Sequence, residues 1–300
     1  MKNTLKIWGF IALAAVISLT LSCKQEEEKG VSLPSAPGID KAPALPGDAK
    51  VPNLADAVEL FENFGGYNGV IGNILSEAYD AAFDAAFKAA NNGKSLDAWG
   101  TEQIASTGNT IKATVNNING TKEGVTVKGK TSGEVTVKGL TIAEYFKNSD
   151  DNTNPTAPFT ADGQSYSAKA SANFTFEIPT LVEKNGWQVG GVITVTITNS
   201  YTETLKNKTI EEFASKNSNE TKFACALTIY NVNSKEGARF RWATADKGSY
   251  NQRKISNGGY SEMSDLEVYG SSTLVGKALS VNSYLVGDVT DIALSAWNIF

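Results

Sequence analysis

The stretch Tyr166–Ile178, YSAKASANFTFEI, decides the fold class of this chain. Tyrosine, alanine, phenylalanine and isoleucine alternate there with serine, lysine, asparagine, threonine and glutamate. Successive side chains of a β-strand point to opposite faces, so this period of two predicts a long strand with one dry and one wet face. One-sided alternation is typical of antiparallel sheets rather than of βαβ units.

Other stretches with the same period surround this one. They are Val189–Ile197, Phe223–Ile229 and Ala238–Trp242, with weaker strands at Ile111–Ile118, Leu266–Tyr269, Leu274–Val286 and Val289–Ala296. Gly124–Gly129 and Glu134–Gly139 share the letters VTVKG and predict a β-hairpin that turns at 129–133. A short helix is expected at Ile210–Ser215. The predicted fold is mainly β, an antiparallel β-sandwich or small open barrel preceded by a helical segment.

The chain before these strands has a helical period. Between Val70 and Ala90 apolar residues recur at spacings of three and four, and Tyr79, Phe83 and Phe87 lie four apart. Charged residues occupy the other side, so we expect a helix packed on a sheet, with a partner- or membrane-binding helix as the alternative. A shorter helix is expected from Asn53 to the glycines at 65–72.

The first residues of the chain predict export. Lys2 and Lys6 precede Ile7–Leu21, an uncharged and mostly apolar stretch. It suits the core of a signal peptide and is shorter than the roughly 20 apolar residues of a spanning helix. A strongly polar stretch, KQEEE at 24–28, follows directly.

The end of this segment, LTLSC at 19–23, resembles the lipobox of bacterial lipoproteins in the relaxed form familiar from spirochaetes. The resemblance implies cleavage between Ser22 and Cys23 and lipid on Cys23. It implies an exported protein, anchored in a membrane by its N-terminal lipid. Lys24 rather than aspartate follows the cysteine, which by the enteric sorting rule favours the outer membrane, facing either the cell surface or the periplasm. The alternative is an ordinary signal peptide with a chance cysteine.

Residues 24–52 resemble a tether. They contain five of the eight prolines of the chain and show no apolar period. Proline fixes φ and lacks an N–H donor, so this stretch favours extended, solvated backbone. The expected organisation is a signal peptide at 1–22, a lipidated cysteine and tether at 23–52, a helical segment at 53–100 and a β-rich domain at 101–300.

Composition restricts the chemistry. The formal charge is −5 and there is no histidine, which removes the commonest general base and metal ligand. The acidic balance argues against nucleic acid and against adsorption to anionic lipid. With Cys23 lipidated, Cys225 has no disulfide partner and is expected to be a small buried residue.

Two motifs suggest ligands but fit poorly. Gly124–Thr131, GVTVKGKT, satisfies the phosphate-loop pattern, but its variable positions alternate like a strand, and the motif requires a loop that opens a helix. We therefore expect no nucleotide. Asp150–Pro155, DDNTNP, resembles the start of a calcium loop, but Pro155 stands where glycine is needed and Ala161 where a glutamate is needed. We expect no metal and no cofactor.

Candidate ligand-binding residues are few. Trp187, Trp242 and Trp297 could line a sugar or peptide groove, since aromatic rings stack on such ligands and also fill cores. Trp187 and Tyr260 flank glycines and are the better surface candidates, while Trp242 is expected in the core. No catalytic residue is identified, and paired carboxylates need tertiary structure to be judged.

The function predicted from the sequence is a lipid-anchored lipoprotein of the cell envelope. Its β-rich domain is expected to be soluble, to serve a binding or structural role and not to be an enzyme. The expected partners are the membrane, through the N-terminal lipid, and an envelope or extracellular protein or glycan. Two alternatives stay open: an extracytoplasmic hydrolase with two carboxylates, and an outer-membrane β-barrel that ends at Phe300.

Overall fold

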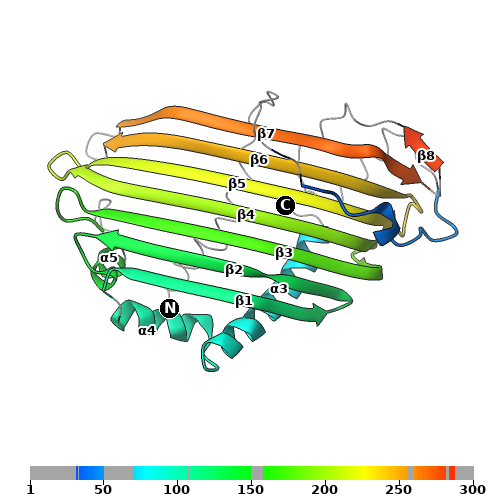
Figure 1. Cartoon of the computed structure of the whole chain (residues 1–300), viewed down its shortest axis with the longest axis horizontal. Helices are drawn as coiled ribbons and strands as arrows, with labels where there is room; N and C mark the ends of the chain where they lie inside the picture. Colours follow the sequence, from blue (N-terminus) through cyan, green and yellow to red (C-terminus); the bar gives the residue numbers. More distant parts are fainter. Residues whose placement is uncertain are drawn as a thin grey trace.

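A computed structural model describes residues 32, 34–50, 70–106, 108–149, 158–255, 260–281 and 284–287. Eight strands form one open antiparallel sheet, in which each strand pairs with the next one along the chain (Figure 1). They are β1 (Thr110–Lys122), β2 (Val125–Lys138), β3 (Ser165–Lys184), β4 (Trp187–Asn207), β5 (Glu212–Asn231), β6 (Gly237–Ile255), β7 (Tyr260–Val281) and β8 (Tyr284–Gly287). The predicted fold class, mainly β and antiparallel after a helical segment, is confirmed. The strands belong to a single sheet.

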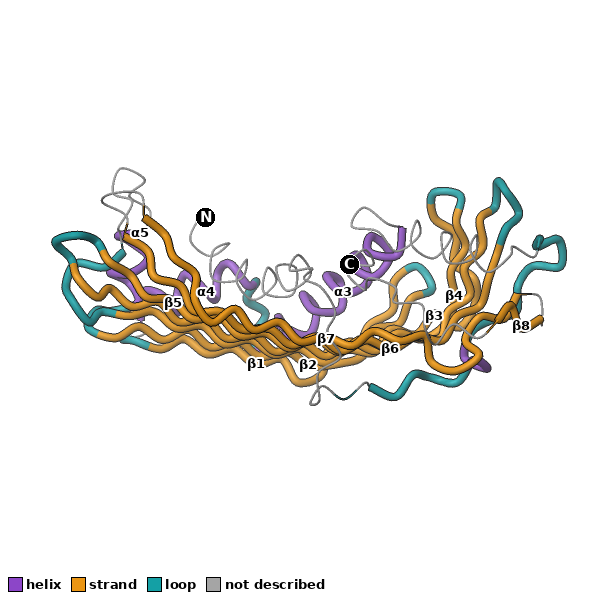
Figure 2. Tube along the Cα trace, turned by 90° about the horizontal axis from the view of Figure 1, so that it is seen from above, coloured by secondary structure: helices purple, strands orange, loops and turns teal. Residues whose placement is uncertain are grey.

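The sheet is curved, and three helices lie on its concave side (Figure 2). These helices are α3 (Val70–Ala90), α4 (Leu96–Ser106) and α5 (Ile142–Ser149). α3 packs mainly on β1, where Gly120 allows the close approach: a Cβ added at Gly120 would lie 2.9 Å from the Cβ of Ala82. No helix in the described ranges is long and apolar enough to cross a membrane.

Alternation along the strands explains the core. On the concave face Ile111, Val127 and Phe176 are buried, while their neighbours in sequence point to the convex face. Each fully buried side chain of this size contributes about 1.5–3 kcal/mol relative to an exposed one. The helices add an aromatic row, in which the ring centroids of Phe83 and Phe87 lie 5.7 Å apart and those of Phe87 and Trp99 5.6 Å.

The helix predicted between Val70 and Ala90 is confirmed with those bounds, packed against the sheet. Sequence reasoning missed α4 and α5, although both carry start signals. The amide of Ala98 donates to the Ser95 hydroxyl at the start of α4. At the start of α5, the amide of Glu144 donates to the Thr141 hydroxyl and the Glu144 carboxylate accepts from the amide of Thr141, which is a capping box.

The predicted hairpin at 124–139 is wrong. Val125–Lys138 is one continuous strand, and the turn lies earlier, at Glu123 and Gly124, which both have positive φ. Glycine at 129 does not mark a turn but a close contact: a Cβ there would lie 2.4 Å from the Phe174 ring on the neighbouring strand. A glycine inside a strand often marks such an approach rather than a break.

The short helix expected at Ile210–Ser215 is also wrong. Residues 208–211 form a turn, and β5 begins at Glu212. Leu205 pairs with Phe213, so the two long strands β4 and β5 continue to this turn. Ladder pairing with β4 and β6 thus outweighs the weak helical pattern.

The expected tether is in part docked on the sheet. Residues Ala36–Lys50, called the strap below, cross the convex face of β5 and β6 and include the 3-10 helix η1 (Ile39–Lys41). Arg239 donates to the carbonyls of Ile39 and Ala42, at 2.7 Å each. These bonds compensate for the hydrogen bonds that a proline-rich segment cannot make within itself.

Glycine and side-chain contacts complete the attachment of the strap. A Cβ at Gly190 would lie 2.7 Å from Pro43, and one at Gly237 would lie 2.5 Å from Leu45, so both glycines make room for it. Further on, Asp48 accepts from the hydroxyl of Tyr230 and pairs with Lys235, each at 3.1 Å. The Lys235 ammonium, more than the Tyr230 hydroxyl, lowers the pKa of Asp48.

Several expected features lie outside the described residues. They are the signal peptide with Ser22 and Cys23, the helix from Asn53, the calcium-like loop Asp150–Pro155, the strand Val289–Ala296, Trp297 and Phe300.

Candidate functional site

The concave face of β4 and β5 changes character along the strands. Near the turn at 185–186 this face is apolar, with Ile193 paired to Cys225 and Val189 paired to Ile229. Toward the other end it becomes polar: Asn199 pairs with Asn219, Tyr201 with Asn217 and Glu203 with Ser215. These positions continue the buried row, so they mark a polar stretch where the alternation calls for apolar residues.

Three tyrosines border this polar stretch. α5 places Tyr145 over Tyr166 of β3, with ring centroids 4.6 Å apart and an angle of 13° between the planes. The rings of Tyr166 and Tyr201 follow at 6.3 Å. Burial raises the pKa of both Tyr145 and Tyr166, so their phenol groups stay protonated at neutral pH and remain hydrogen-bond donors.

Glu203 is the carboxylate of this stretch. Burial raises its pKa, and a hydrogen bond from Tyr201 together with the charge of Lys254 partly offsets that shift. A carboxyl group in this environment is less costly to bury when it is protonated. In its protonated form Glu203 can donate as well as accept a hydrogen bond.

Two polar atoms of the same face are buried without a partner. They are Oδ1 of Asn217 and Oγ1 of Thr221, and Thr221 is only 7% exposed. A buried polar atom without a hydrogen bond costs about 1–3 kcal/mol, and native proteins contain few of them. Such atoms, together with the tyrosine hydroxyls and the carboxyl group, mark hydrogen-bonding capacity that the described residues leave unused.

The acidic residues at concave positions of the strands lie far apart along the sheet. In strands β1–β6 two acidic residues occupy concave register positions, Glu203 and Asp246. Glu203 pairs with Ser215 and Asp246 with Thr221, so they differ by six residues along β5, or about 20 Å. Paired carboxylates in glycosidases stand about 5–9.5 Å apart. Clusters of three or more metal-ligating residues are absent from the described residues.

The residues singled out from the sequence do not converge here. Trp187 is half-buried and packs at the edge of the core, beside the turn at 185–186. Cys225 is fully buried on the concave face of β5, as predicted. Gly124–Thr131 forms a turn and a strand, which leaves no phosphate loop. The side chains of Trp242 and Tyr260 lie outside the described part of the structure.

Sequence reasoning missed the polar stretch, although a signal exists. The letters FASKNSNETKF at 213–223 keep the period of two but place serine, asparagine and threonine where β5 otherwise has apolar residues. Sequence alone reads this as a break between strands. Paired strands on both sides reveal it as part of one long strand with a polar segment on its inner face.

Comparisons with protein-family models, curated proteins and solved structures find no match for this chain.

Proposed function

We propose that this protein is a lipid-anchored lipoprotein of the cell envelope whose concave sheet face binds a neutral, hydroxyl-rich ligand such as a glycan. The observation that carries the binding site is the pair of buried atoms without partners, Oδ1 of Asn217 and Oγ1 of Thr221. The anchor is supported by the leader and the LTLSC box that ends at Cys23.

The chemistry of the polar stretch favours this ligand class. Hydroxyl groups both donate and accept, which suits a site that offers a free amide oxygen at Asn217 and protonated tyrosine hydroxyls. Tyrosine rings bury apolar area while keeping a polar end, and they serve well where sugar rings are bound. A strongly anionic ligand would meet Glu203 on the same face, which disfavours it.

We propose a role in binding rather than in catalysis, because Glu203 has no second carboxylate within reach on β1–β6. An extracytoplasmic hydrolase would need two carboxyl groups that converge. Release of reducing ends from envelope or host glycans by the purified chain would contradict this part of the proposal.

The binding site is tested with the isosteric replacement Thr221→Val in residues 24–300. We expect glycan affinity, measured by calorimetry against envelope and host glycans, to fall about tenfold through the loss of one hydrogen bond. The free energy of unfolding should rise by about 1 kcal/mol, because a buried hydroxyl without a partner is removed. Substitution of a residue with a purely structural role would not lower glycan affinity and raise stability at the same time.

Thr198→Val is the matched control, since Thr198 is an exposed threonine on the convex face of β4. It should leave both affinity and stability within about 0.5 kcal/mol of the parent. If no glycan binds, or if Thr221→Val and Thr198→Val behave alike, the proposed site is wrong.

The anchor is tested independently of the ligand. Cys23→Ser should abolish metabolic labelling with a fatty acid and leave uncleaved or released protein. Labelling that is unchanged would contradict the lipobox. Protease treatment of intact cells, with a periplasmic marker as a control, distinguishes a domain facing outward from one facing the periplasm.

A further inference from the structure

The convex face of the sheet is basic although the protein is acidic. Four acidic residues at convex positions pair with basic residues of the same face. The pairs are Lys112–Glu134, Lys128–Glu177, Lys222–Glu220 and Arg253–Glu212. These pairs are nearly neutral together, so the charge of the face is decided by what remains.

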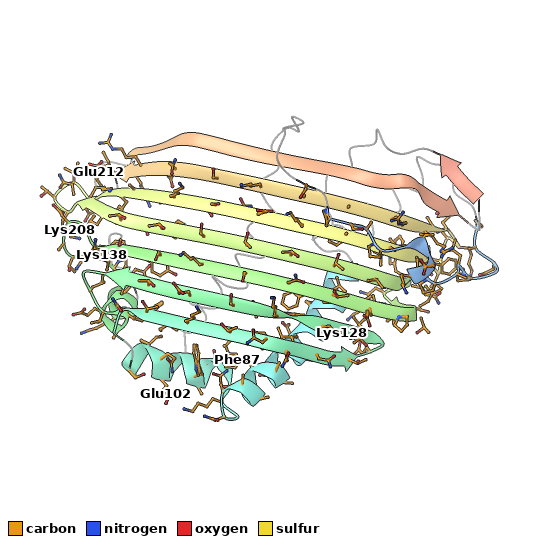
Figure 3. The ribbon with its side chains drawn as sticks, in the orientation of Figure 1. Phe87, Glu102, Lys128, Lys138, Lys208 and Glu212 are labelled. Carbon is orange, nitrogen blue, oxygen red and sulfur yellow. The ribbon has the colours of Figure 1, made fainter. Side chains whose placement is uncertain are left out.

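What remains on β1–β6 is mostly lysine, with Glu183 on β3, while the convex register positions of β7 carry Glu262 and Glu267. Lys130, Lys138, Lys169, Lys216 and Lys247 occupy convex register positions of β2, β3, β5 and β6 and are exposed. None of these five lysines has an ion pair within 4 Å among the described residues. Lys138 stands at one end of β2 (Figure 3) and Lys130 lies further along the same strand, while Lys128 near the other end is paired with Glu177.

The helices on the concave side have the opposite balance. These three helices carry six acidic residues against Lys88 and Lys147; the acidic ones are Glu77, Asp80, Asp84, Asp97, Glu102 and Glu144. The formal charge of −5 for the full sequence is therefore unevenly distributed, with acidic helices on one side of the sheet and lysines on the other. A field of this kind orients a protein at a charged surface even when its net charge has the same sign as the surface.

The strap directs the lipid anchor to this same basic face. Ala36 lies on the convex face with Ala224 of β5 and Ala243 of β6. Arg241 fixes this point by donating to the carbonyls of Pro37 and Ala36, at 2.7 and 3.0 Å. Between Cys23 and Ala36 the chain has only residues 24–35, which reach at most about 40 Å when fully extended.

We propose that the convex face rests on an anionic lipid surface, with the acidic helices and the concave polar stretch turned away from it. Two separate observations support this placement: the excess of unpaired lysines on the face, and the attachment of the anchoring segment to the same face. The orientation rests on the proposed lipid anchor at Cys23, whereas the attraction to anionic lipid depends on the lysines alone. Each lysine near such a surface contributes about 1 kcal/mol.

Vesicle binding of residues 24–300, which carry no lipid, tests the attraction. Wild-type protein should sediment with vesicles of phosphatidylcholine and phosphatidylglycerol, but not with phosphatidylcholine alone, and added salt should weaken binding. The triple variant Lys130→Gln, Lys169→Gln, Lys216→Gln should bind about 100-fold more weakly, or about fivefold for each lysine.

The matched control is Lys94→Gln, Lys122→Gln, Lys147→Gln, which removes the same charge from exposed lysines away from the convex face. Its vesicle affinity should stay within about twofold of the wild type, and both triples should unfold at the wild-type midpoint. Equal losses in the two triples, or no preference for the anionic vesicles, would overturn the proposal. So would binding to a soluble anionic polysaccharide without binding to vesicles.

Lysine footprinting tests the orientation without any substitution. Residues 23–300 are coupled through Cys23 to a maleimide lipid, a reaction that the fully buried Cys225 should not undergo. On anionic vesicles, acetylation of Lys130, Lys169 and Lys216 should fall, while that of Lys88 and Lys94 should not change. Equal protection on both sides overturns the orientation. Because no glycan is present, this result is independent of the ligand proposed for the concave face.

Discussion

The two faces of this sheet are built from alternate residues of the same strands, yet the concave face excludes water over β1–β3 and the convex face is largely exposed to it. The concave face is dry and covered by helices over β1–β3, so each polar group there requires a partner. The convex face is rich in serine, threonine and lysine, and the docked strap Ala36–Lys50 crosses its β5–β6 part. An unpaired lysine outside is ordinary, whereas an unpaired asparagine oxygen inside requires an explanation.

The helix-covered core of the concave face should be the part of the protein most sensitive to substitution. Phe87→Ala should lower the free energy of unfolding by about 3–5 kcal/mol, because Phe87 is 1% exposed and its ring contacts those of Phe83 and Trp99. Chemical denaturation measures the loss. Ile210→Ala is the control, since Ile210 is 39% exposed in a turn and should change stability by less than about 0.5 kcal/mol. Similar losses in both variants would contradict a core centred under the helices.

Substitutions that release the strap from the convex face should have a smaller effect on stability. Arg241→Ala removes two hydrogen bonds to the strap and should cost about 2–3 kcal/mol. Hydrogen exchange should then accelerate in residues 41–50, where the amide of Lys50 donates to the carbonyl of Lys235 at 2.7 Å.

Arg253→Ala is the matched control for the strap, because Arg253 lies on the same strand and face but pairs with Glu212 at the surface. An exposed pair of this kind contributes about 0–1 kcal/mol. Exchange in the strap should be unchanged in this variant. If Arg253→Ala loosens the strap as much as Arg241→Ala does, the arginine bonds are not what holds it.

Local signals predicted the regular parts of the fold. The period of two in Tyr166–Ile178 predicted β3, and the spacing of three and four predicted α3 with its bounds. These predictions succeeded because burial of one face leaves a trace in every second or every third and fourth residue. Alternation also placed Cys225 in the interior of β5.

Features that depend on distant partners were missed. The strap looks like free chain because its hydrogen bonds come from Arg239 and Arg241, about 200 residues later in the sequence. The turn expected at 129–133 is absent because Gly129 accommodates Phe174 of the neighbouring strand. The polar stretch of β5 was hidden because its strand character comes from ladder pairing rather than from apolar residues.

Glu203, the acidic residue on the concave face of β4, should have a smaller and pH-dependent effect on stability. Burial raises the pKa of Glu203, so the fold favours its protonated form. The contribution of Glu203 to stability is therefore fully present below the ordinary pKa of about 4.5, and it is lost as pH rises through the raised value.

Glu203→Gln keeps the size of the side chain and remains neutral, so the stability difference between this variant and the wild type should grow in favour of the variant as pH rises from about 4.5. Urea unfolding at a series of pH values measures this difference. A bound ligand that accepts a hydrogen bond from protonated Glu203 should raise the folded-state pKa further, so the difference should keep growing to higher pH while its onset stays near the pKa of the unfolded chain. A difference that is constant across the series would mean that Glu203 is solvated like the glutamates of the convex face.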